Sequence, residues 1–333
     1  MTAAPPWPWT SDEALRFDRF MDLALHDPER GYYARRIRGV GVGGDFTTAP
    51  MISGLLAKGI AAWAAKSLSA SGCRDLIEIG PGEGRLAAAV LKALPWHRRW
   101  RTRLHLVETS KPLREKQRAL LGHHATWHDS LESALDACQG NACLFSNELI
   151  DAFPVRRFRL EGWGISELFL IPGEVPREVW RPADALPDSV QFAHAHCPGQ
   201  ILEVHESVQH WLARWMPHWR SGAMLTIDYG AETAELYHRR PRGTLRGYLH
   251  QNRIEGHAVY QNPGRQDLTA DVDFSDLSKW LHDRSPGSST LTTQRDFLRP
   301  HLRSNRPADL ALTDEHGAGI AFRILDFQKH ELT

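Results

Sequence analysis

The sequence DLIEIGPGEGRLAAAVLKAL, residues 75–94, contains a short apolar segment, a turn with three glycines and an amphipathic segment. DLIEIG, residues 75–80, is predicted to be a buried strand, and RLAAAVLKAL, residues 85–94, is predicted to be a helix. Glycines between a strand and a helix let the backbone turn tightly and let a ligand approach the helix N-terminus. The stretch therefore predicts the first strand-turn-helix unit of a ligand-binding α/β sheet.

The sequence continues outward from this unit in the same alternation of strands and helices. Further strands are predicted at residues 104–108, 125–129, 142–148 and 223–229, and further helices at 51–68, 112–121 and 206–216. Strands that alternate with helices at this interval indicate βαβ units, so we expect an α/β fold with a mostly parallel, Rossmann-like sheet covered by helices on both faces. The last apolar segment, residues 320–330, is predicted to be a closing edge strand.

Other segments interrupt this alternation and suggest insertions. VRRFRLEGWGISELFLI, residues 155–171, alternates as a β-hairpin does, and residues 243–274 are polar and rich in turns. The expected organisation is N-terminal helices with a glycine-rich lid at 1–68, a cofactor-binding core at 69–154, a β insertion at 155–200, core again at 201–235, a substrate-side loop insertion at 236–290 and C-terminal core strands at 291–333.

Composition limits the classes of function. The 333 residues carry 40 basic and 40 acidic side chains, so no overall positive charge favours nucleic acid as a partner. The four cysteines form no CxxC pair, and neither a secretory leader nor an apolar span of membrane length is apparent, so we expect a cytoplasmic protein without membrane insertion. The sequence does not indicate an oligomeric state.

The glycine turn favours S-adenosyl-L-methionine over a dinucleotide. Gly80, Gly82 and Gly84 have GxGxG spacing, whereas dinucleotide-binding turns usually have GxGxxG. Glu78 lies two residues before the first glycine, where a carboxylate would repel a pyrophosphate but would pair with a cationic amino acid moiety. S-adenosyl-L-methionine has such a moiety, so these four residues are predicted to bind it.

The next two predicted strands also end in acidic residues. Glu108 and the adjacent Thr109 end the second strand, and a carboxylate there can accept hydrogen bonds from both ribose hydroxyls. Asp129 and Ser130 end the third strand, where a side-chain acceptor would meet the adenine amino group. Because ligands of open α/β sheets bind at the carboxyl ends of the strands, these residues are predicted to line one cofactor site.

The fourth predicted strand ends in FSNELIDAFP, residues 145–154. The run is either an ordinary strand boundary or part of an active site, and its density of polar residues favours the second interpretation. Asn147 and Glu148 are therefore expected to face the reacting centre, with Asn147 also on the cofactor side. A methyl transfer from a sulfonium needs no metal, and none is expected.

Several motifs together resemble the MidA-like family of class I S-adenosylmethionine-dependent methyltransferases. They are FMDLALHDPERGYY, GDFTTAP, EIGPGEGRLA, SNELIDAFPV, IDYG and DLTADVDF, and the resemblance covers nearly the whole chain. It implies a class I methyltransferase fold. Eukaryotic members are mitochondrial assembly factors for respiratory complex I, which implies an arginine of a complex I core subunit as acceptor and the mitochondrial matrix as location if the source is eukaryotic.

The resemblance also suggests roles for acidic residues on the acceptor side. An arginine acceptor is protonated and weakly nucleophilic, so carboxylates that clamp it and take its proton would aid transfer. Glu148 is the first candidate, followed by Asp45 and Asp267, each on a polar loop that contains glycine; for Asp267 a turn-capping role is equally plausible. Thr48 and Pro50, within GDFTTAP, are expected on the cofactor side of the lid.

Three alternative functions stay open at this point. A nicotinamide-dependent oxidoreductase would require a GxGxxG turn and a proton-relay residue, and neither is evident in the sequence. A catalytically weak or inactive assembly factor could keep the same fold, and a small molecule could replace the protein acceptor. Arg85 and His250 depart from the usual family pattern and leave the acceptor open.

Overall fold

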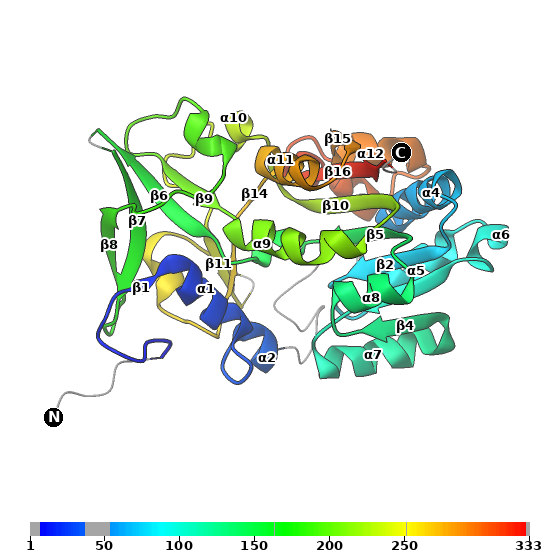
Figure 1. Cartoon of the computed structure of the whole chain (residues 1–333), viewed down its shortest axis with the longest axis horizontal. Coiled ribbons are helices and arrows are strands. Elements are labelled where there is room, and N and C mark those ends of the chain that lie inside the picture. The colour runs from blue at the N-terminus through cyan, green and yellow to red at the C-terminus, as the bar shows by residue number, and fades with distance from the viewer. Residues whose placement is uncertain (1–6, 37–53, 163, 251, 331–333) are drawn as a thin grey trace. The chain divides into compact units, whose positions relative to one another are not determined.

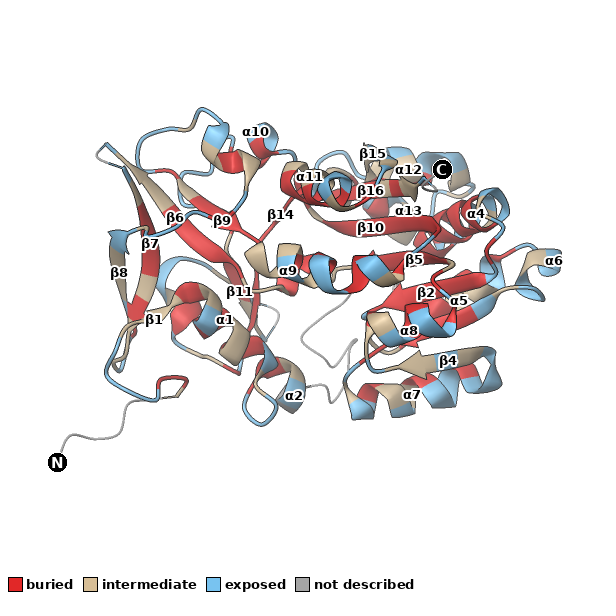
Figure 2. Cartoon of the chain, in the orientation of Figure 1, coloured by how far each residue is buried: buried red, intermediate tan, exposed pale blue. Residues whose placement is uncertain are grey.

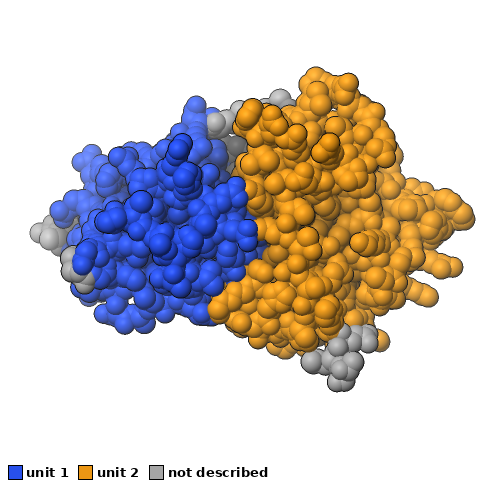
Figure 3. All heavy atoms as spheres, turned by 90° about the horizontal axis from the view of Figure 1, so that it is seen from above, with its two compact units in different colours: residues 1–38, 150–210, 231–277 blue, residues 39–149, 211–230, 278–333 orange. Residues whose placement is uncertain are grey.

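The computed structural model describes residues 7–36, 54–162, 164–250 and 252–330. The chain forms two compact units, coloured separately in Figure 3. Unit 1 comprises residues 1–38, 150–210 and 231–277, and unit 2 comprises residues 39–149, 211–230 and 278–333. Both units are therefore assembled from segments that are far apart in the sequence.

Unit 2 is built on one mixed sheet. Its strands are β2 (Asp75–Ile79), β3 (Arg103–Val107), β4 (Ala125–His128), β5 (Ala142–Asn147), β10 (Gly222–Ala231), β15 (Gly287–Thr293) and β16 (Phe322–Lys329). The spatial order is β15-β16-β10-β5-β2-β3-β4, in which β4, β3, β2, β5 and β10 run parallel and β16 is antiparallel to β10 (Figure 1). The predicted mostly parallel Rossmann-like sheet is thus confirmed.

Helices cover both faces of this sheet. The helices of unit 2 are α4 (Leu55–Ala70), α5 (Arg85–Ala93), α6 (Trp96–Arg99), α7 (Lys111–Leu121), α8 (Leu131–Ala137), α12 (Gln294–Leu298), α13 (Pro307–Leu312) and α14 (Ala318–Ala321), joined by parts of α9 (Glu206–Trp215) and α11 (Phe274–Arg284). Leu56 of α4 and Leu86 of α5 share one apolar cluster with Leu76 and Phe145 of the sheet. On the opposite face Trp219 packs against Phe327, with 6.2 Å between ring centroids.

The central strands of the unit 2 sheet coincide with apolar runs of the sequence because these strands are buried. All five residues of β2 are buried, and Figure 2 shows the central strands of the sheet in the buried colour. Strands covered on both faces have near-continuous apolar sequences. This pattern makes the central strands easy to recognise in the sequence.

The prediction for the last strand was wrong. β16 is not an edge strand, because it lies between β10 and β15, with Ile324 paired to both Ile227 and Thr292. The edge is β15, whose sequence GSSTLTT is largely polar. An edge strand pairs with a neighbouring strand on one side only and tolerates hydroxyl side chains. Its sequence therefore lacks the apolar pattern by which a strand is recognised.

Unit 1 is mainly antiparallel β structure. One sheet has the order β1-β7-β6-β9, with β8 paired to β7, and a three-stranded sheet has the order β12-β11-β13. The strands are β1 (Leu15–Arg16), β6 (Arg156–Glu161), β7 (Gly164–Ile171), β8 (Arg177–Pro182), β9 (Ile201–Val204), β11 (Arg246–Leu249), β12 (Asn252–Ile254), β13 (Asp267–Thr269) and β14 (Val272–Asp273). The helices are α1 (Phe17–His26), α2 (Tyr32–Arg36) and α10 (Thr233–Leu236).

Buried ion pairs hold the unit 1 sheet. Arg156 of β6 donates two hydrogen bonds to Glu167 of β7, at 2.7 and 2.8 Å. Arg157 donates to Glu203 of β9 at 3.1 Å and to the Tyr260 hydroxyl at 2.9 Å. Because both guanidinium groups are almost wholly buried and paired, loss of one partner would leave a buried charge uncompensated.

Among the described residues, no helix is both long enough and apolar enough to cross a membrane.

Candidate active site

The carboxyl ends of four strands lie along one edge of the unit 2 sheet. The parallel register pairs Ile79 with Val107 and with Ser146, and Val107 with His128. The residues that follow these pairs therefore stand together at that edge. They are the predicted site residues Gly80, Glu108, Asp129 and Asn147.

The glycine turn needs glycine at all three positions, for two different reasons. Gly80, Gly82 and Gly84 have φ values of +67°, +54° and +79°, a conformation that side chains with a Cβ rarely adopt. A Cβ at Gly80 would stand 2.8 Å from Leu149 Cδ1, and one at Gly84 would stand 3.1 Å from Gln117 Cγ. A Cβ at Gly82 would meet no described atom within 4 Å, so this part of the turn faces open space.

Glu78 lies beneath the turn and is only 2% exposed. Its carboxyl group accepts a hydrogen bond from the backbone N–H of Ala87, the third residue of α5, whose N-cap Gly84 has no side chain to do so. Its Oε2 is buried and has no hydrogen-bond partner among the described atoms. Burial raises the pKa of this carboxyl to about 8, so a cation beside Oε2 would restore its charged form.

Glu108 is held in place by its neighbours at the end of β3. Its Oε1 accepts a hydrogen bond of 2.8 Å from the Ser110 backbone N–H, and its Oε2 lies 3.4 Å from the donor Gln117 Nε2. Burial raises the pKa of the carboxyl, and the hydrogen bonds from Ser110, Gln117 and Thr109 oppose that rise. The side chain of Thr109 is exposed, so its described contribution is its backbone N–H.

Gln117 is a site residue that the sequence prediction missed. It is fully buried on α7, donates to the Gly82 carbonyl at 2.7 Å, and accepts from Trp127 Nε1 at 2.9 Å. It therefore connects the glycine turn to the ends of two other strands. The available signal was its spacing, because Gln117 stands four residues from both Leu113 and Leu121 on the buried stripe of the helix.

Arg114 joins the ends of β3 and β4 and was also missed. It donates to the Glu108 carbonyl at 2.5 Å and to the His128 carbonyl at 3.0 Å, and it pairs with the carboxylate of Asp129. The Asp129 side chain is 89% exposed, so it is accessible to a ligand. Ser130 instead caps α8, since its hydroxyl accepts from the Ser133 backbone N–H at 3.1 Å.

Asn147 and Glu148 form a strained polar turn at the end of β5. Asn147 Nδ2 donates to Glu148 Oε1 at 3.2 Å, while Asn147 Oδ1 is buried and has no partner among the described atoms. Glu148 has φ +50°, which is uncommon outside glycine, and its N–H donates to the Ile227 carbonyl at 3.0 Å. Such strain persists where surrounding contacts impose it, and it is concentrated at functional sites.

Asp228 of β10 supplies one of those contacts. Its carboxylate is fully buried and accepts from the Leu149 backbone N–H at 3.1 Å and from its neighbour Tyr229 at 2.9 Å. Asp228 thus fixes the chain immediately after Glu148. Its position indicates that it orients the turn.

Of the two other acidic residues predicted on the acceptor side, Asp267 belongs to unit 1. It is 1% exposed and accepts a hydrogen bond of 3.2 Å from the Tyr33 hydroxyl. Burial, with a contribution from the negative charge of Asp151, raises the pKa of Asp267 to about 7. Asp151, which no prediction included, is buried in the same unit, and burial raises its pKa to about 6. Asp45, Thr48 and Pro50 lie outside the described residues.

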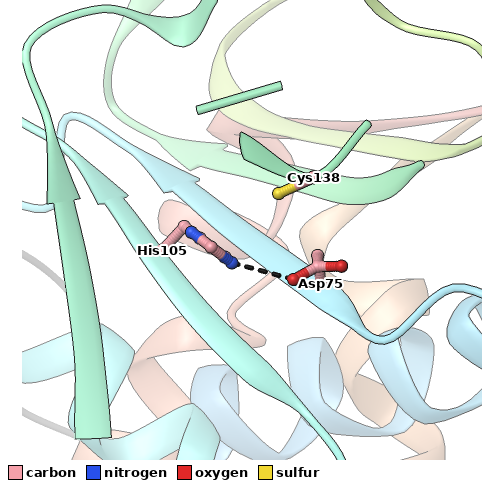
Figure 4. Close-up of side chains that lie close together, drawn as sticks. All are labelled: Asp75, His105 and Cys138. Carbon is pink, nitrogen blue, oxygen red and sulfur yellow. Dashed lines mark hydrogen bonds and ion pairs between the residues drawn. The ribbon is translucent and has the colours of Figure 1, made fainter. Parts of the chain in front are cut away.

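One group of possible metal ligands stands among the described residues, in unit 2. Asp75, His105 and Cys138 place their donor atoms within 4.8 Å of one another (Figure 4). Asp75 already bonds His105 Nε2 at 2.8 Å and Arg103 at 2.5 Å, and the other ring nitrogen of His105 lies 2.9 Å from His128. The group is therefore a buried hydrogen-bond network, in which the atoms of Asp75 and His105 that could bind a metal already take part in hydrogen bonds.

Comparison with known proteins gives a family match over most of the chain. Residues 59–290 match the model of the family described as "Putative S-adenosyl-L-methionine-dependent methyltransferase". The zebrafish "Protein arginine methyltransferase NDUFAF7, mitochondrial" is 29% identical, with 84% of this chain and 71% of that protein covered. The rat protein of the same name is 28% identical, with 84% and 69% covered.

Solved structures show the same relationship. A COG1565 superfamily member from Burkholderia thailandensis, bound to S-adenosyl-homocysteine, has a TM-score of 0.84 and 28% identity, with 95% of this chain and 88% of that chain covered. A native structure of a COG1565 superfamily protein from the same organism has a TM-score of 0.81 and 26% identity, with 95% and 87% covered. The chain therefore belongs to the MidA-like, or COG1565, family of S-adenosyl-L-methionine-dependent methyltransferases.

Proposed function

We propose that this methyltransferase transfers its methyl group to an arginine side chain of a protein. The observation that carries the proposal is the Glu148 carboxylate, held beside Asn147 in a strained turn at the strand edge that also bears the glycine turn. The names of the zebrafish and rat relatives, which are protein arginine methyltransferases, support the same acceptor.

The carboxyl ends of the strands in the unit 2 sheet offer groups that suit S-adenosyl-L-methionine. The unpartnered Glu78 Oε2 suits a cationic amino group, and the open face of Gly82 leaves room for close backbone approach. Glu108, oriented by Gln117 and Ser110, would hold the ribose, and the exposed Asp129 would hold the adenine. The unpartnered Asn147 Oδ1 offers one more acceptor at the same edge.

The side chains of the protein would position the acceptor guanidinium and take up the proton that it releases. S-adenosyl-L-methionine supplies a methyl group on a sulfonium whose departing thioether is neutral. The Glu148 carboxylate would pair with the acceptor guanidinium, orient one nitrogen toward the methyl group and take the proton that this nitrogen releases when its bond to carbon forms. Asp228 would keep Glu148 in place through the Leu149 N–H, since a small displacement of a catalytic group lowers the rate steeply.

Asp267 and Asp45 stay proposed as further carboxylates on the acceptor side, and Thr48 and Pro50 as residues on the cofactor side. Asp267 is buried beside Tyr33, with a pKa of about 7, so it would exchange a proton near neutral pH. The contacts that support this role are with Tyr33 and Asp151, which belong to unit 1 like Asp267 itself.

A core subunit of respiratory complex I, or its bacterial counterpart, is the first acceptor to test. We would look for this acceptor in the cytoplasm of a bacterial source, or in mitochondria for a eukaryotic source; the zebrafish and rat relatives are named as mitochondrial proteins. The proposed partner is thus a protein.

The experiment uses S-adenosyl-L-methionine with an isotopically heavy methyl group, the purified protein and a cell extract of the source organism. Labelled proteins are hydrolysed, and the amino acids are identified by mass spectrometry. We expect more heavy methylarginine with the wild-type protein than with Gly82→Val, the control without a working cofactor site that shows the label added by other methyltransferases of the extract. If the label in excess of the Gly82→Val sample lies in another amino acid, or only in small molecules, the arginine acceptor is refuted while the methyltransferase assignment stays intact.

A further inference from the structure

A pocket with a volume of about 640 Å³ lies in unit 2. Its lining residues come from α9, from the segments that lead into β5 and β10, and from the ends of α11 and β16. They are Asn141, Ala213, Met216, Pro217, Trp219, Arg220, Ser221, Arg284 and Lys329. Three of them are cations and none is a carboxylate.

This pocket stands at the other end of the strands from the candidate active site. Asn141 precedes β5, while Asn147 ends it. Gly222 begins β10 and pairs with Lys329 at the end of β16. At about 3.3 Å per residue, the six residues from Asn141 to Asn147 separate the two places by roughly 20 Å. The pocket is therefore distinct from the edge that bears the glycine turn.

Its cations lack negative partners among the residues that the structure describes. Lys329 donates to the Trp219 carbonyl, and its Nζ lies 5.2 Å from the centroid of the Trp219 ring. Arg284 donates to the Trp280 carbonyl at 3.3 Å, and Arg220 forms no described ion pair. Burial lowers the pKa of Lys329, because its charge is partly removed from water without a compensating carboxylate.

Apart from Asn141 and Ser221, which hydrogen-bond to each other at 2.8 Å, the rest of the wall is apolar. Trp219 and Met216 are 1% and 3% exposed, and Ala213 and Pro217 extend the same surface. A ligand that fills this space would therefore place an apolar or aromatic body against Met216 and Trp219 and direct negative oxygens toward the cations. Both guanidinium groups can bind such oxygens in bidentate fashion.

We propose that this pocket binds a small organic oxyanion, with a phosphate or carboxylate head group on a compact apolar body. Arg220, Arg284 and Lys329 would hold the head group. The site is separate from methyl transfer, so it does not depend on the proposed acceptor.

Calorimetric titration of the full chain tests the site with four probes: phenyl phosphate, benzoate, inorganic phosphate and benzyl alcohol. We expect at least one of the first two to bind, and inorganic phosphate and the neutral alcohol to bind at least tenfold more weakly. Preference between phenyl phosphate and benzoate identifies the head group. Inorganic phosphate that binds as tightly as phenyl phosphate, or failure of both organic anions to bind, would overturn the proposal.

Variants assign the binding to these side chains. Arg284→Gln and Lys329→Met should each weaken the preferred probe at least tenfold. Arg99→Gln, on the exposed helix α6 of the same unit, is the matched control and should leave the affinity unchanged. Two pocket variants are used so that one remains informative if the other fails to fold, as judged by circular dichroism. Equal weakening in Arg99→Gln would show nonspecific charge attraction and would refute the site.

Discussion

The side-chain amide of Gln117 donates a hydrogen bond of 2.7 Å to the carbonyl oxygen of Gly82. The same buried side chain lies 3.4 Å from Glu108 Oε2 and accepts a hydrogen bond from Trp127 of β4. One residue of α7 thus sets the positions of the glycine turn and of the carboxylate proposed to bind ribose. Preorganisation of this kind lowers the cost of ordering a site when its ligand binds.

Substitution of Gln117 should therefore affect both stability and cofactor affinity. Gln117→Leu would leave Trp127 Nε1 and the Gly82 carbonyl without their partner, at a cost of about 1–3 kcal/mol in the free energy of unfolding. We also expect weaker binding of S-adenosyl-L-methionine. Urea unfolding and calorimetry measure the two effects, and Gln261→Leu, at an exposed position, is the control. Wild-type affinity in a destabilised Gln117→Leu would show that Gln117 has only a structural role.

Gly82→Val should abolish cofactor binding. Its φ of +54° disfavours any Cβ, and the added side chain would occupy the open face of the turn. Gly72→Val is a close control, because Gly72 has φ +69° and its Cβ would also meet no described atom within 4 Å. Both variants should lose about 1 kcal/mol or more of stability. Calorimetry should detect a loss of cofactor affinity in Gly82→Val alone; equal affinities in the two variants would displace the site from this turn.

Glu78 should make the stability of the cofactor-free protein depend on pH. Burial raises its folded-state pKa from 4.5 to about 8, so its neutral form favours the folded state. The stability that it contributes is complete below pH 4.5 and is lost as the pH rises toward 8. Glu78→Gln removes this titration.

Urea titrations at pH 5 and pH 8 measure how far the unfolding free energy falls between these pH values in the wild type and in Glu78→Gln. That fall should be smaller in Glu78→Gln than in the wild type, by an amount on the order of a few kcal/mol. Other buried acids contribute equally to both proteins and cancel. Identical pH dependence would mean that Glu78 is already charged in the folded protein.

Glu148→Gln should separate binding from transfer. The amide keeps the size of the side chain and an oxygen for Asn147 Nδ2, so cofactor affinity should be unchanged. It cannot take a proton or balance the charge of a guanidinium, and a loss of at least 10²-fold in transfer is expected. Glu132→Gln, on α8 of the same unit, is the control. Wild-type turnover in Glu148→Gln would remove Glu148 from the mechanism.

Asp267 should stabilise the protein more in acid than at neutral pH. Its folded-state pKa is raised from 3.8 to about 7, so its contribution is complete below pH 3.8 and is lost as the pH rises through 7. Asp267→Asn should therefore show a smaller decline in unfolding free energy between pH 5 and pH 8 than the wild type. NMR titration of the side-chain carboxyl carbon provides a direct check, and a midpoint near pH 4 would contradict the raised pKa.

The sequence allowed prediction of those parts of the site that local patterns determine. Glu78 and Glu108 end or follow largely buried apolar runs, and Asp129 follows the short, partly buried strand β4; parallel pairing brings these strand ends to one edge. Gln117 and Arg114 were missed because their roles depend on tertiary contacts of α7, which no short motif encodes. The edge strand β15 was missed because its polar sequence lacks an apolar period.

Calorimetric titration of the purified wild-type protein with S-adenosyl-L-methionine, S-adenosyl-homocysteine and, as a control, NADH tests the cofactor site most directly. We expect micromolar binding of both adenosyl ligands to the wild type, loss of that binding in Gly82→Val and no binding of NADH. Binding of NADH, or no binding of either adenosyl ligand to a folded sample, would contradict the placement of the cofactor at the glycine turn.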